Sequence, residues 1–423
     1  MSYKNETQPQ PSFMPELVEV VDLDSGHIAV EKPEHDLLHS DSEHGVLPTG
    51  QVSEVLIARE SGPCGGVRAS ILGTMGVHSA HGEETPVKIN SKPTNGADSN
   101  AQFAKLGIEF DIDTNTLQPG DTFMISAHGN PKQLKEAKDR DSVTVYDSTC
   151  IFVETTHREI RTAAERAWQE NKKTGVIYLS IGGRPDHAEF VGTTELMESL
   201  DVPYIAIHDR DEIENLRGIS DLADWERVRI VSQTTNNAEE AVKLAESTRL
   251  LLRDTYPEID TETFPFNERD ICRTVTDRQN AVREMVGLGV DCLVIVGSVN
   301  SKNTKSLVDV GIDEAKKRVA AGEDVSLSRV ILVNSFGQLP RDIVGRVGIA
   351  SGASTLDLNV RGVADFLNAS QQPEEIGESD RDRKATDIFP PVHANRDPLQ
   401  ARLAQLILEQ AALNRENYNV TRR

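Results

Sequence analysis

Three of the four cysteines lie directly before segments with helical periodicity, so each thiol stands where a helix would begin. Cys150 marks the changeover from alternating β-branched residues to a helical pattern, and Cys64 and Cys272 open similar patterns. The backbone N–H groups in a helix's first turn have no intrahelical partner and favour the anionic form of a nearby thiol. Each of the three could therefore act as a nucleophile or as a metal ligand. Cys292 lies in an apolar strand, and we interpret it as an inert core residue.

The spacing of these three cysteines indicates a pseudo-repeat, because 86 and 122 residues separate them, about one small α/β unit each. This suggests three domains around a centre, each directing one thiolate inward. Structural zinc sites use closely paired ligands, and the chain has no Cys-x-x-Cys. An iron–sulfur cube held by three cysteines would keep one iron free to bind a substrate oxygen as a Lewis acid. The pattern alone does not distinguish this interpretation from the alternative of three unrelated buried thiols.

Short polar loops follow several predicted strands. In parallel α/β sheets such loops form ligand sites, and helix N-termini with hydroxyl and N–H groups suit phosphate. One such loop is most often an ordinary helix N-cap, whereas several together favour an anionic ligand. The loops lie at residues 126–129, 232–235, 297–304 and 351–355. No phosphate-binding Gly-x-x-x-x-Gly-Lys-Ser/Thr or dinucleotide-binding Gly-x-Gly-x-x-Gly pattern occurs, so nucleotide binding has no support.

His187 and Glu189 follow another predicted strand and lie two residues apart. In a loop, both side chains could face one cavity and pass protons. A solvated His–Glu pair is the alternative interpretation until something places the two beside the cysteines.

Strands and helices alternate from about residue 52 to about residue 367, which is typical of α/β units with parallel sheets. Predicted strands are 52–58, 123–126, 175–180, 228–231, 292–296, 330–333 and 346–349. We therefore expect an α/β protein with several small doubly wound domains. The predicted divisions are an acidic N-terminal arm over 1–51, α/β domains over 52–149, 150–271 and 272–368, and a polar linker with a C-terminal helix over 369–423.

The bulk composition of the 423 residues excludes several classes of protein. A formal net charge of −23 argues against general nucleic-acid binding, which needs a basic surface. The first thirty residues hold no apolar run typical of a signal peptide, and the longest apolar stretches are too short to span a bilayer. Four cysteines are too few for a disulfide scaffold, so in a reducing compartment they are expected to be buried, catalytic or metal-bound. We expect a cytoplasmic protein without a membrane anchor.

Eight short motifs occur in the order seen in 4-hydroxy-3-methylbut-2-enyl diphosphate reductases, and the chain resembles this family over about residues 53–367. The motifs are PCGGV at 63–67, SAHG at 126–129, DSTC at 147–150, HAE at 187–189, QTT at 233–235, DIC at 270–272 with DRQ at 277–279, NSKN at 300–303, and GAS at 352–354. The resemblance implies a trefoil of three α/β domains around a [4Fe-4S] cluster held by Cys64, Cys150 and Cys272.

The resemblance also implies an activity. The family removes the allylic hydroxyl of its diphosphate substrate as water and produces isopentenyl and dimethylallyl diphosphates. Its electrons come from ferredoxin or flavodoxin. The residues that match its proton-delivery network are Glu189, Thr234 and His187. Those that match its diphosphate clamp are His128, Ser301, Asn303 and Ser354.

The chain departs from the family at several positions. Thr94 aligns with a histidine of the diphosphate clamp, and Lys302 replaces the second serine of an Asn-Ser-Ser-Asn motif. Pro63 precedes the first cysteine where the family usually has phenylalanine, and Ile151 replaces a proline after the second. Losing one charge-assisted phosphate contact costs about 1.5–3 kcal/mol. Lys302 would return much of this if it pointed inward.

Three functions therefore stay open. The first is a divergent but authentic reductase. The second is a paralogue with the same three-cysteine cluster that acts on a different substrate. The third is a non-catalytic iron–sulfur protein that senses redox state or iron. The presence of His187, Glu189 and Thr234 argues against the third, because a sensor has no need of proton delivery.

Overall fold

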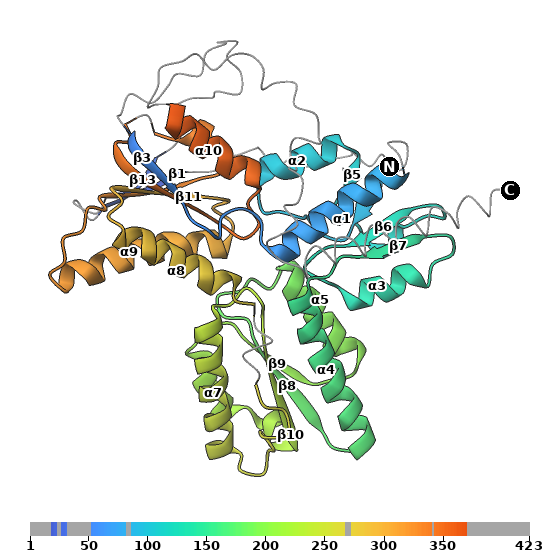
Figure 1. Ribbon diagram of the computed structural model, residues 1–423. Helices are drawn as coiled ribbons and strands as arrows, with labels where there is room; N and C mark the ends of the chain where they lie inside the picture. The colour runs from blue at the N-terminus through green and yellow to red at the C-terminus, as the bar shows by residue number, and fades with distance from the viewer. Residues whose placement is uncertain are drawn as a thin grey trace, which may run out of the picture.

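Three layered units of sheet and helix lie around a common centre and form a trefoil (Figure 1). The computed structural model describes residues 18–22, 27–31, 52–81, 86–266, 272–340 and 342–369. We name the units first, second and third lobe, after the order in which helices α1, α4 and α8 enter them. The predicted α/β class, with parallel sheets in a pseudo-threefold arrangement, is confirmed. The predicted polar linker and C-terminal helix, beyond residue 369, lie outside the described residues.

The first lobe is a parallel sheet with the strand order β5-β4-β6-β7. Neighbouring strand residues point to opposite faces, so Met124 packs beneath α1 and Phe123 beneath α3. The strands are β4 (Val87–Ile89), β5 (Ile108–Glu109), β6 (Thr122–Ile125) and β7 (Thr144–Asp147), and the helices are α1 (Gly65–His81), α2 (Ala97–Lys105) and α3 (Pro131–Lys138).

The second lobe is a parallel sheet with the order β10-β8-β9. Tyr178 faces α4 and α5 on one side, and Ile177 faces α7 on the other. The strands are β8 (Thr174–Leu179), β9 (Tyr204–Ile207) and β10 (Arg227–Ser232), and the helices are α4 (Ile151–Glu170), α5 (Ala188–Ser199), α6 (Glu212–Asn215) and α7 (Ala238–Thr255).

The third lobe has a six-stranded mixed sheet with the order β2-β1-β12-β11-β13-β3. Leu293 packs beneath α8 and α9, and Val294 packs beneath α10 on the opposite face. The strands are β1 (Val18–Asp22), β2 (His27–Glu31), β3 (Val52–Ile57), β11 (Cys292–Val296), β12 (Arg329–Val333) and β13 (Gly345–Ser351), and the helices are α8 (Thr274–Gly287), α9 (Lys302–Ala320) and α10 (Asp357–Ala369).

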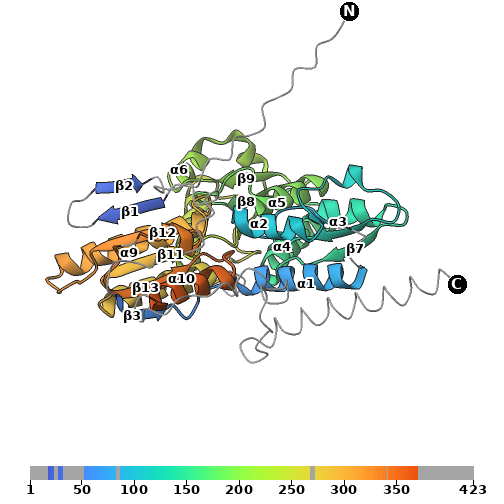
Figure 2. The same ribbon diagram turned by 90° about the horizontal axis from the view of Figure 1, so that it is seen from above.

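Two features of the third lobe differ from the expected order along the chain. Strands β1 and β2 pair antiparallel, and β1 extends the sheet beyond β12 (Figure 2). The sequence predicted regular structure only from Val52 onward, so the two five-residue strands before it were not predicted. Strand β3 pairs with β13, so the first predicted strand belongs to the last sheet. The division into domains remains a prediction.

The seven predicted strands correspond to β3, β6, β8, β10, β11, β12 and β13, with bounds shifted by at most two residues. Strands β4, β5 and β9 were not among them. Strands β4 and β5 have three and two residues, which is too short for an alternating pattern to stand out.

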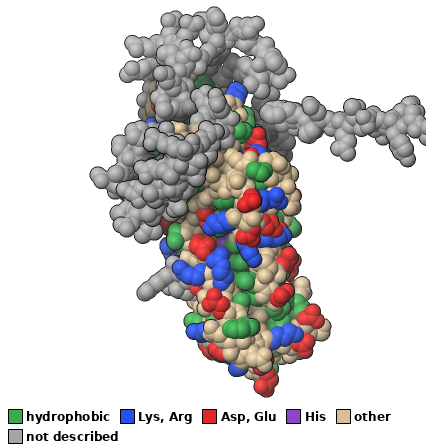
Figure 3. Space-filling view, turned by 90° about the vertical axis from the view of Figure 1, so that its right-hand side faces the viewer, with side chains coloured by type: hydrophobic (Ala, Val, Ile, Leu, Met, Phe, Trp, Pro, Cys, Tyr) green, Lys and Arg blue, Asp and Glu red, His purple; other side chains and the backbone are tan. Residues whose placement is uncertain are grey.

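The surface carries both signs of charge. On the side that lies to the right in Figure 1, basic and acidic side chains are interspersed over the described part of the chain (Figure 3). The net charge of −23 is thus not gathered into one acidic field on that side. Within the described ranges, no helix has the length and apolarity needed to cross a membrane.

Candidate active site

The three predicted cysteine ligands lie at the starts of helices that begin near the meeting point of the lobes (Figure 1). Cys64 directly precedes α1, Cys150 is the N-cap of α4, and Cys272 lies two residues before α8. The charges of Cys64 and Cys272 raise the pKa of Cys150, and Cys64 also raises the pKa of Cys272. The three sulfur atoms are therefore within electrostatic reach of one another, although 86 and 122 residues separate them in the chain.

Two of these cysteines are tied by their backbones to neighbouring strand ends. The N–H of Cys64 donates to the carbonyl of Ala353, just beyond β13, at 2.7 Å. The N–H of Cys150 donates to the carbonyl of Ala127, just beyond β6, at 3.0 Å. Each thiol thus stands where the chain passes from one sheet to the helix of the next lobe.

Burial, rather than the helix end, has the largest effect on the pKa values of Cys150 and Cys272. It raises the pKa of Cys150 to about 12 and that of Cys272 to about 11. Polar groups at the helix starts act in the opposite direction: the N–H groups of Phe152 and Val153 lower the pKa of Cys150, and the N–H and hydroxyl groups of Thr274 lower that of Cys272. The expected helix-end effect is present but is outweighed. A bound cation such as iron would be needed to hold these sulfurs as thiolates at neutral pH.

The surroundings of the thiols fit an iron–sulfur cluster. A Cβ on Gly66 would lie 2.5 Å from the Cys150 sulfur, so only glycine lets the start of α1 approach so closely. Across the described ranges, no group of three or more His, Cys, Asp or Glu side chains is placed to hold one metal ion. A cube binds each thiolate at a different iron and so keeps its ligands farther apart. Hydrogen bonds to the sulfurs also belong to such sites.

Glu189 is a buried carboxyl group in the first turn of α5, with 1% of its surface exposed. Its Oε1 accepts from the Thr234 N–H at 2.7 Å and its Oε2 from the Thr234 hydroxyl at 2.9 Å. Burial raises the pKa of Glu189 to about 7, against the opposing effect of these two hydrogen bonds. The pKa of Cys272 is raised mainly by burial and in small part by the charge of Glu189, so the carboxyl group is within electrostatic reach of this one cysteine. A carboxyl group with this pKa can donate a proton near neutral pH.

His187 caps α5 beside this carboxyl group. Its Nδ1 accepts from the Glu189 N–H at 3.3 Å and lies 3.1 Å from the Gln233 side-chain nitrogen. These contacts leave Nε2 as the protonated nitrogen of the neutral ring. The His128 ring packs edge-on against it, with centroids 5.3 Å apart. Gln233 was part of a motif in the sequence but had no predicted role.

Both histidines are neutral at pH 7 in this arrangement. Burial lowers the pKa of His187, and burial together with His187 lowers the pKa of His128 to about 3. The Nδ1 atom of His128 is buried and has no hydrogen-bond partner in the described part of the chain. It is available to a ligand.

The start of α9 carries a second set of available polar groups. Ser301 caps the helix and accepts from the Thr304 N–H at 3.3 Å. Both polar atoms of the Asn303 side chain are buried, and neither finds a partner among the described residues. Buried polar groups are nearly always satisfied in native proteins, so these two atoms point to a missing ligand.

Lys302 reaches from the third lobe towards the second. Its Nζ donates to the Ile181 carbonyl, and a Cβ on Gly182 would lie 3.3 Å from it. Its charge lowers the pKa of His187, and partial burial lowers its own pKa. The ammonium group is therefore directed towards the second lobe, within electrostatic reach of His187.

Thr94 is 3% exposed, and its hydroxyl donates to the Asn100 side chain at 3.0 Å and to the Gly96 carbonyl at 3.4 Å. It is thus engaged within its own loop. The next residue, Asn95, donates to the Ser354 hydroxyl at 3.2 Å. The structure brings Ser354 together with Asn95 rather than with Thr94, and Asn95 had no predicted role of its own.

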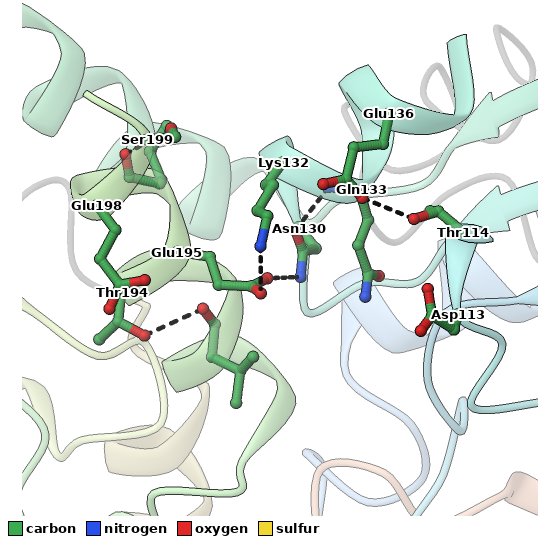
Figure 4. Close-up of polar contacts among 12 residues, drawn as sticks. Asp113, Thr114, Asn130, Lys132, Gln133, Glu136, Thr194, Glu195, Glu198 and Ser199 are labelled. Atoms are coloured by element: carbon green, nitrogen blue, oxygen red, sulfur yellow. Dashed lines mark hydrogen bonds and ion pairs between the residues drawn. The ribbon is translucent and has the colours of Figure 1, made fainter. Parts of the chain in front are cut away.

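A polar contact between α3 and α5 holds the His128 loop against the helix that carries Glu189. Figure 4 shows the Glu195 carboxylate meeting Asn130 and Lys132, with distances of 2.8 Å to Asn130 Nδ2 and 3.1 Å to Lys132 Nζ. A Cβ on Gly192 would lie 2.2 Å from the Gly129 carbonyl, so the helix touches the loop backbone. This contact fixes how far the loop that carries His128 lies from His187 at the start of α5.

We expect Glu195→Ala to lower the free energy of unfolding by about 1–2 kcal/mol, because it removes one hydrogen bond to Asn130 and one partly exposed ion pair to Lys132. Urea denaturation measures this. The matched control is Glu165→Ala on the exposed face of α4, where the change should cost less than about 0.5 kcal/mol. Equal losses in the two variants would show that the α3–α5 contact adds nothing.

Comparisons with known proteins agree on one family. The family model described as LytB protein matches residues 55–368. A 4-hydroxy-3-methylbut-2-enyl diphosphate reductase of Acidothermus cellulolyticus is 29% identical over 366 residues, covering 86% of this chain and 96% of the relative. One of Anaplasma marginale is 27% identical over 317 residues, covering 74% of this chain and 82% of the relative.

Solved structures share the fold. The structure of (E)-4-hydroxy-3-methyl-but-2-enyl diphosphate reductase, the terminal enzyme of the non-mevalonate pathway, matches with a TM-score of 0.51 and 24% identity, covering 74% of this chain and 99% of that one. The E-1-hydroxy-2-methyl-but-2-enyl-4-diphosphate reductase from Plasmodium falciparum matches with a TM-score of 0.54 and 21% identity, covering 74% and 87%. The resemblance carried by the eight motifs is confirmed. The chain belongs to the LytB protein family.

Proposed function

We propose that this protein is a reductase that converts 4-hydroxy-3-methylbut-2-enyl diphosphate into isopentenyl and dimethylallyl diphosphates. The observation that carries the proposal is the buried Glu189, whose pKa is raised to about 7, within electrostatic reach of a cysteine of the three-thiol site. The net reaction takes two electrons and two protons, breaks the allylic C–O bond, and releases the hydroxyl group as water. The names of the similar proteins support the substrate.

The proposed cofactor is a [4Fe-4S] cluster held by Cys64, Cys150 and Cys272. When bound, it would supply electrons and a Lewis-acidic iron without a protein ligand. The position of each cysteine before a helix and the electrostatic effect of the three thiols on one another support this assignment.

The protein's own contribution to bond breaking is the proton at Glu189. A hydroxide ion is a poor leaving group, so protonation of the departing oxygen lowers the barrier. Thr234 fixes the carboxyl group through two hydrogen bonds, and His187 accepts the N–H of Glu189 and holds the start of α5. We assign Glu189 as the proton donor and Thr234 and His187 as residues that position it.

The diphosphate is proposed to bind between the lobes. Asn303 offers two unpartnered polar atoms at the start of α9, and His128 offers a third at Nδ1. The proposed diphosphate site also includes the hydroxyl groups of Ser301 and Ser354 and the positive charge of Lys302. Thr94 belongs to the proposed clamp as a support for its loop, because its hydroxyl is already bonded to Asn100.

The proposal also covers the electron donor and the cellular compartment. The electron donor would be a small one-electron carrier of the ferredoxin or flavodoxin type. Four cysteines in 423 residues fit a reducing, cytoplasmic compartment.

Anaerobic reconstitution with iron and sulfide, followed by a turnover assay with 4-hydroxy-3-methylbut-2-enyl diphosphate and a chemical reductant, tests the function. We expect both pentenyl diphosphates as products, and none from protein treated without iron. A fully loaded protein that does not turn this diphosphate over would instead favour a paralogue with another substrate.

Asn303→Ala tests the diphosphate clamp. A hydrogen bond to a charged group contributes about 1.5–3 kcal/mol, so the Michaelis constant should rise roughly 10-fold to 100-fold with a smaller change in turnover number. Steady-state kinetics on the loaded variant measures both constants. The matched control is Asn280→Ala on the neighbouring helix α8. The exposed side chain of Asn280 accepts a hydrogen bond from Arg283. An unchanged Michaelis constant in Asn303→Ala would remove this residue from the clamp.

A further inference from the structure

Arg278 in α8 is a buried cation beside the cysteines. Its side chain is 4% exposed. Nη1 donates to the Ser351 carbonyl at 2.8 Å, and Nη2 donates to the Gly62 carbonyl at 2.7 Å. Gly62 lies two residues before Cys64, and Arg278 follows Cys272 in the first half of α8. The guanidinium group thus joins the loop of one cysteine to the helix that begins at another.

The hydrogen-bond partners of Arg278 are neutral. Among the described residues no carboxylate forms an ion pair with it, and Glu60 attracts it only at longer range. The thiols of Cys64 and Cys272 are the other groups whose negative charge would stabilise it. A buried cation is unfavourable unless a nearby negative group compensates its charge. Arginine stays protonated in proteins, so this charge is permanent.

One donor of the guanidinium group is also unused. Its Nε is buried and has no hydrogen-bond partner in the part of the chain that the structure describes. The other two nitrogen atoms are held by the backbone carbonyls of Gly62 and Ser351, which fix the plane of the group. Arg278 therefore presents both a fixed charge and a free N–H in the neighbourhood of the thiols.

We propose that Arg278 raises the reduction potential of the cluster that Cys64, Cys150 and Cys272 would hold, by stabilising its reduced and more negative state. This inference rests on the proposed function. Reduction adds one negative charge, and a buried environment screens the attraction of a fixed cation poorly. Net charge and hydrogen bonding around the sulfurs are among the factors that set such potentials. Arg278 is thus a positioning and tuning residue rather than a catalytic one.

An anaerobic redox titration followed by electron paramagnetic resonance tests the proposal on the reconstituted full chain. Arg278→Gln should lower the ratio of reduced to oxidised cluster at a fixed potential about tenfold or more, which is about 59 mV for a one-electron couple. Arg278→Lys keeps the charge and should stay near the wild-type midpoint. The matched control, Arg283→Gln, removes a charge from the same helix where the side chain bonds only to Asn280, and should leave the midpoint unchanged.

The outcomes separate this inference from the proposed function. If the wild-type chain binds no cluster, the proposed function fails. If it loads fully and Arg278→Gln keeps the wild-type midpoint, only the role of Arg278 is overturned. Equal shifts in the Gln and Lys variants would mean that Arg278 acts through packing alone, which also overturns the proposal. The resonance signal reports only loaded protein, so a lower cluster yield does not disturb the measurement. Should the Gln variant hold no cluster at all, a lowered midpoint in Arg278→Lys contradicts the proposal and a wild-type midpoint supports it.

Discussion

Replacing Glu189 with glutamine is expected to reduce turnover of the loaded protein by about 10²–10⁴-fold, the usual contribution of a general acid. The iron content should stay at the wild-type level, because Glu189 is not among the proposed ligands. Glutamine has nearly the same shape and can still accept from the Thr234 N–H through its carbonyl oxygen, while the Thr234 hydroxyl turns to accept from its amide nitrogen. The variant should therefore fold normally and lose only the proton. Single-turnover kinetics and an iron assay on the same sample measure both quantities.

The control for this change is Glu198→Gln, which makes the same replacement on the exposed side of the same helix. It should keep nearly full turnover. Turnover within about threefold of wild type in Glu189→Gln would contradict the role of this residue, since general acid catalysis contributes far more than that.

The buried state of Glu189 also predicts how stability depends on pH. Its pKa is about 7 in the folded protein, above its ordinary value of 4.5, so folding favours the protonated form. The stabilisation is fully present below about pH 4.5 and is lost as the pH rises through about 7. Urea unfolding of the cluster-free protein between pH 5 and pH 8 should show this loss in the wild type and a smaller slope in Glu189→Gln. Parallel pH profiles for the two proteins would show that Glu189 does not titrate in this range.

Local sequence patterns were sufficient to predict the parts of the fold that carry strong periodicity. β11 was located within its observed bounds, and the helices after Cys64, Cys150 and Cys272 all form. The pairing of β3 with β13, by contrast, joins segments nearly three hundred residues apart, and no local pattern records it. Strands β1 and β2 depend on the edge of β12 in the same way. Partners that are distant in the sequence determine these elements.

In the candidate site, too, some features could be predicted from the sequence and others could not. The residue types of Cys150, Glu189 and Asn303 could be read from motifs, but their burial could not. Burial reverses the expected acidity of Cys150 and Cys272 and raises the pKa of Glu189 to about 7. The role now proposed for Arg278 and the contact of Asn95 with Ser354 both depend on residues that are distant in the sequence. A single sequence offers no signal for such contacts beyond the presence of the residues within a motif.

Removing any one of the three proposed ligands should abolish both cluster and activity, which is the largest effect we expect. Cys64→Ala, Cys150→Ala and Cys272→Ala each delete one of the three proposed thiolate ligands, and alanine offers no replacement ligand. Iron bound after anaerobic reconstitution should fall from about four atoms per chain towards none, since a cube with two protein ligands is held weakly. Turnover should fall below detection. Iron and sulfide assays with the visible absorption spectrum measure the first effect, and the diphosphate assay measures the second.

Cys292→Ala provides the matched control, because it makes the same truncation at a thiol that lies in β11, within the core of the third lobe. Cys292 is 4% exposed, and burial raises its pKa to about 12. It packs among apolar side chains of that core rather than at the start of a helix, so we do not expect it to serve as a ligand. The control should bind iron like the wild type and lose on the order of 1 kcal/mol of stability through the small cavity left behind. If Cys292→Ala loses the cluster, or if one of the other three variants keeps it in full, the assignment of ligands is wrong. The pseudo-repeat of one cysteine per lobe would then have no chemical meaning.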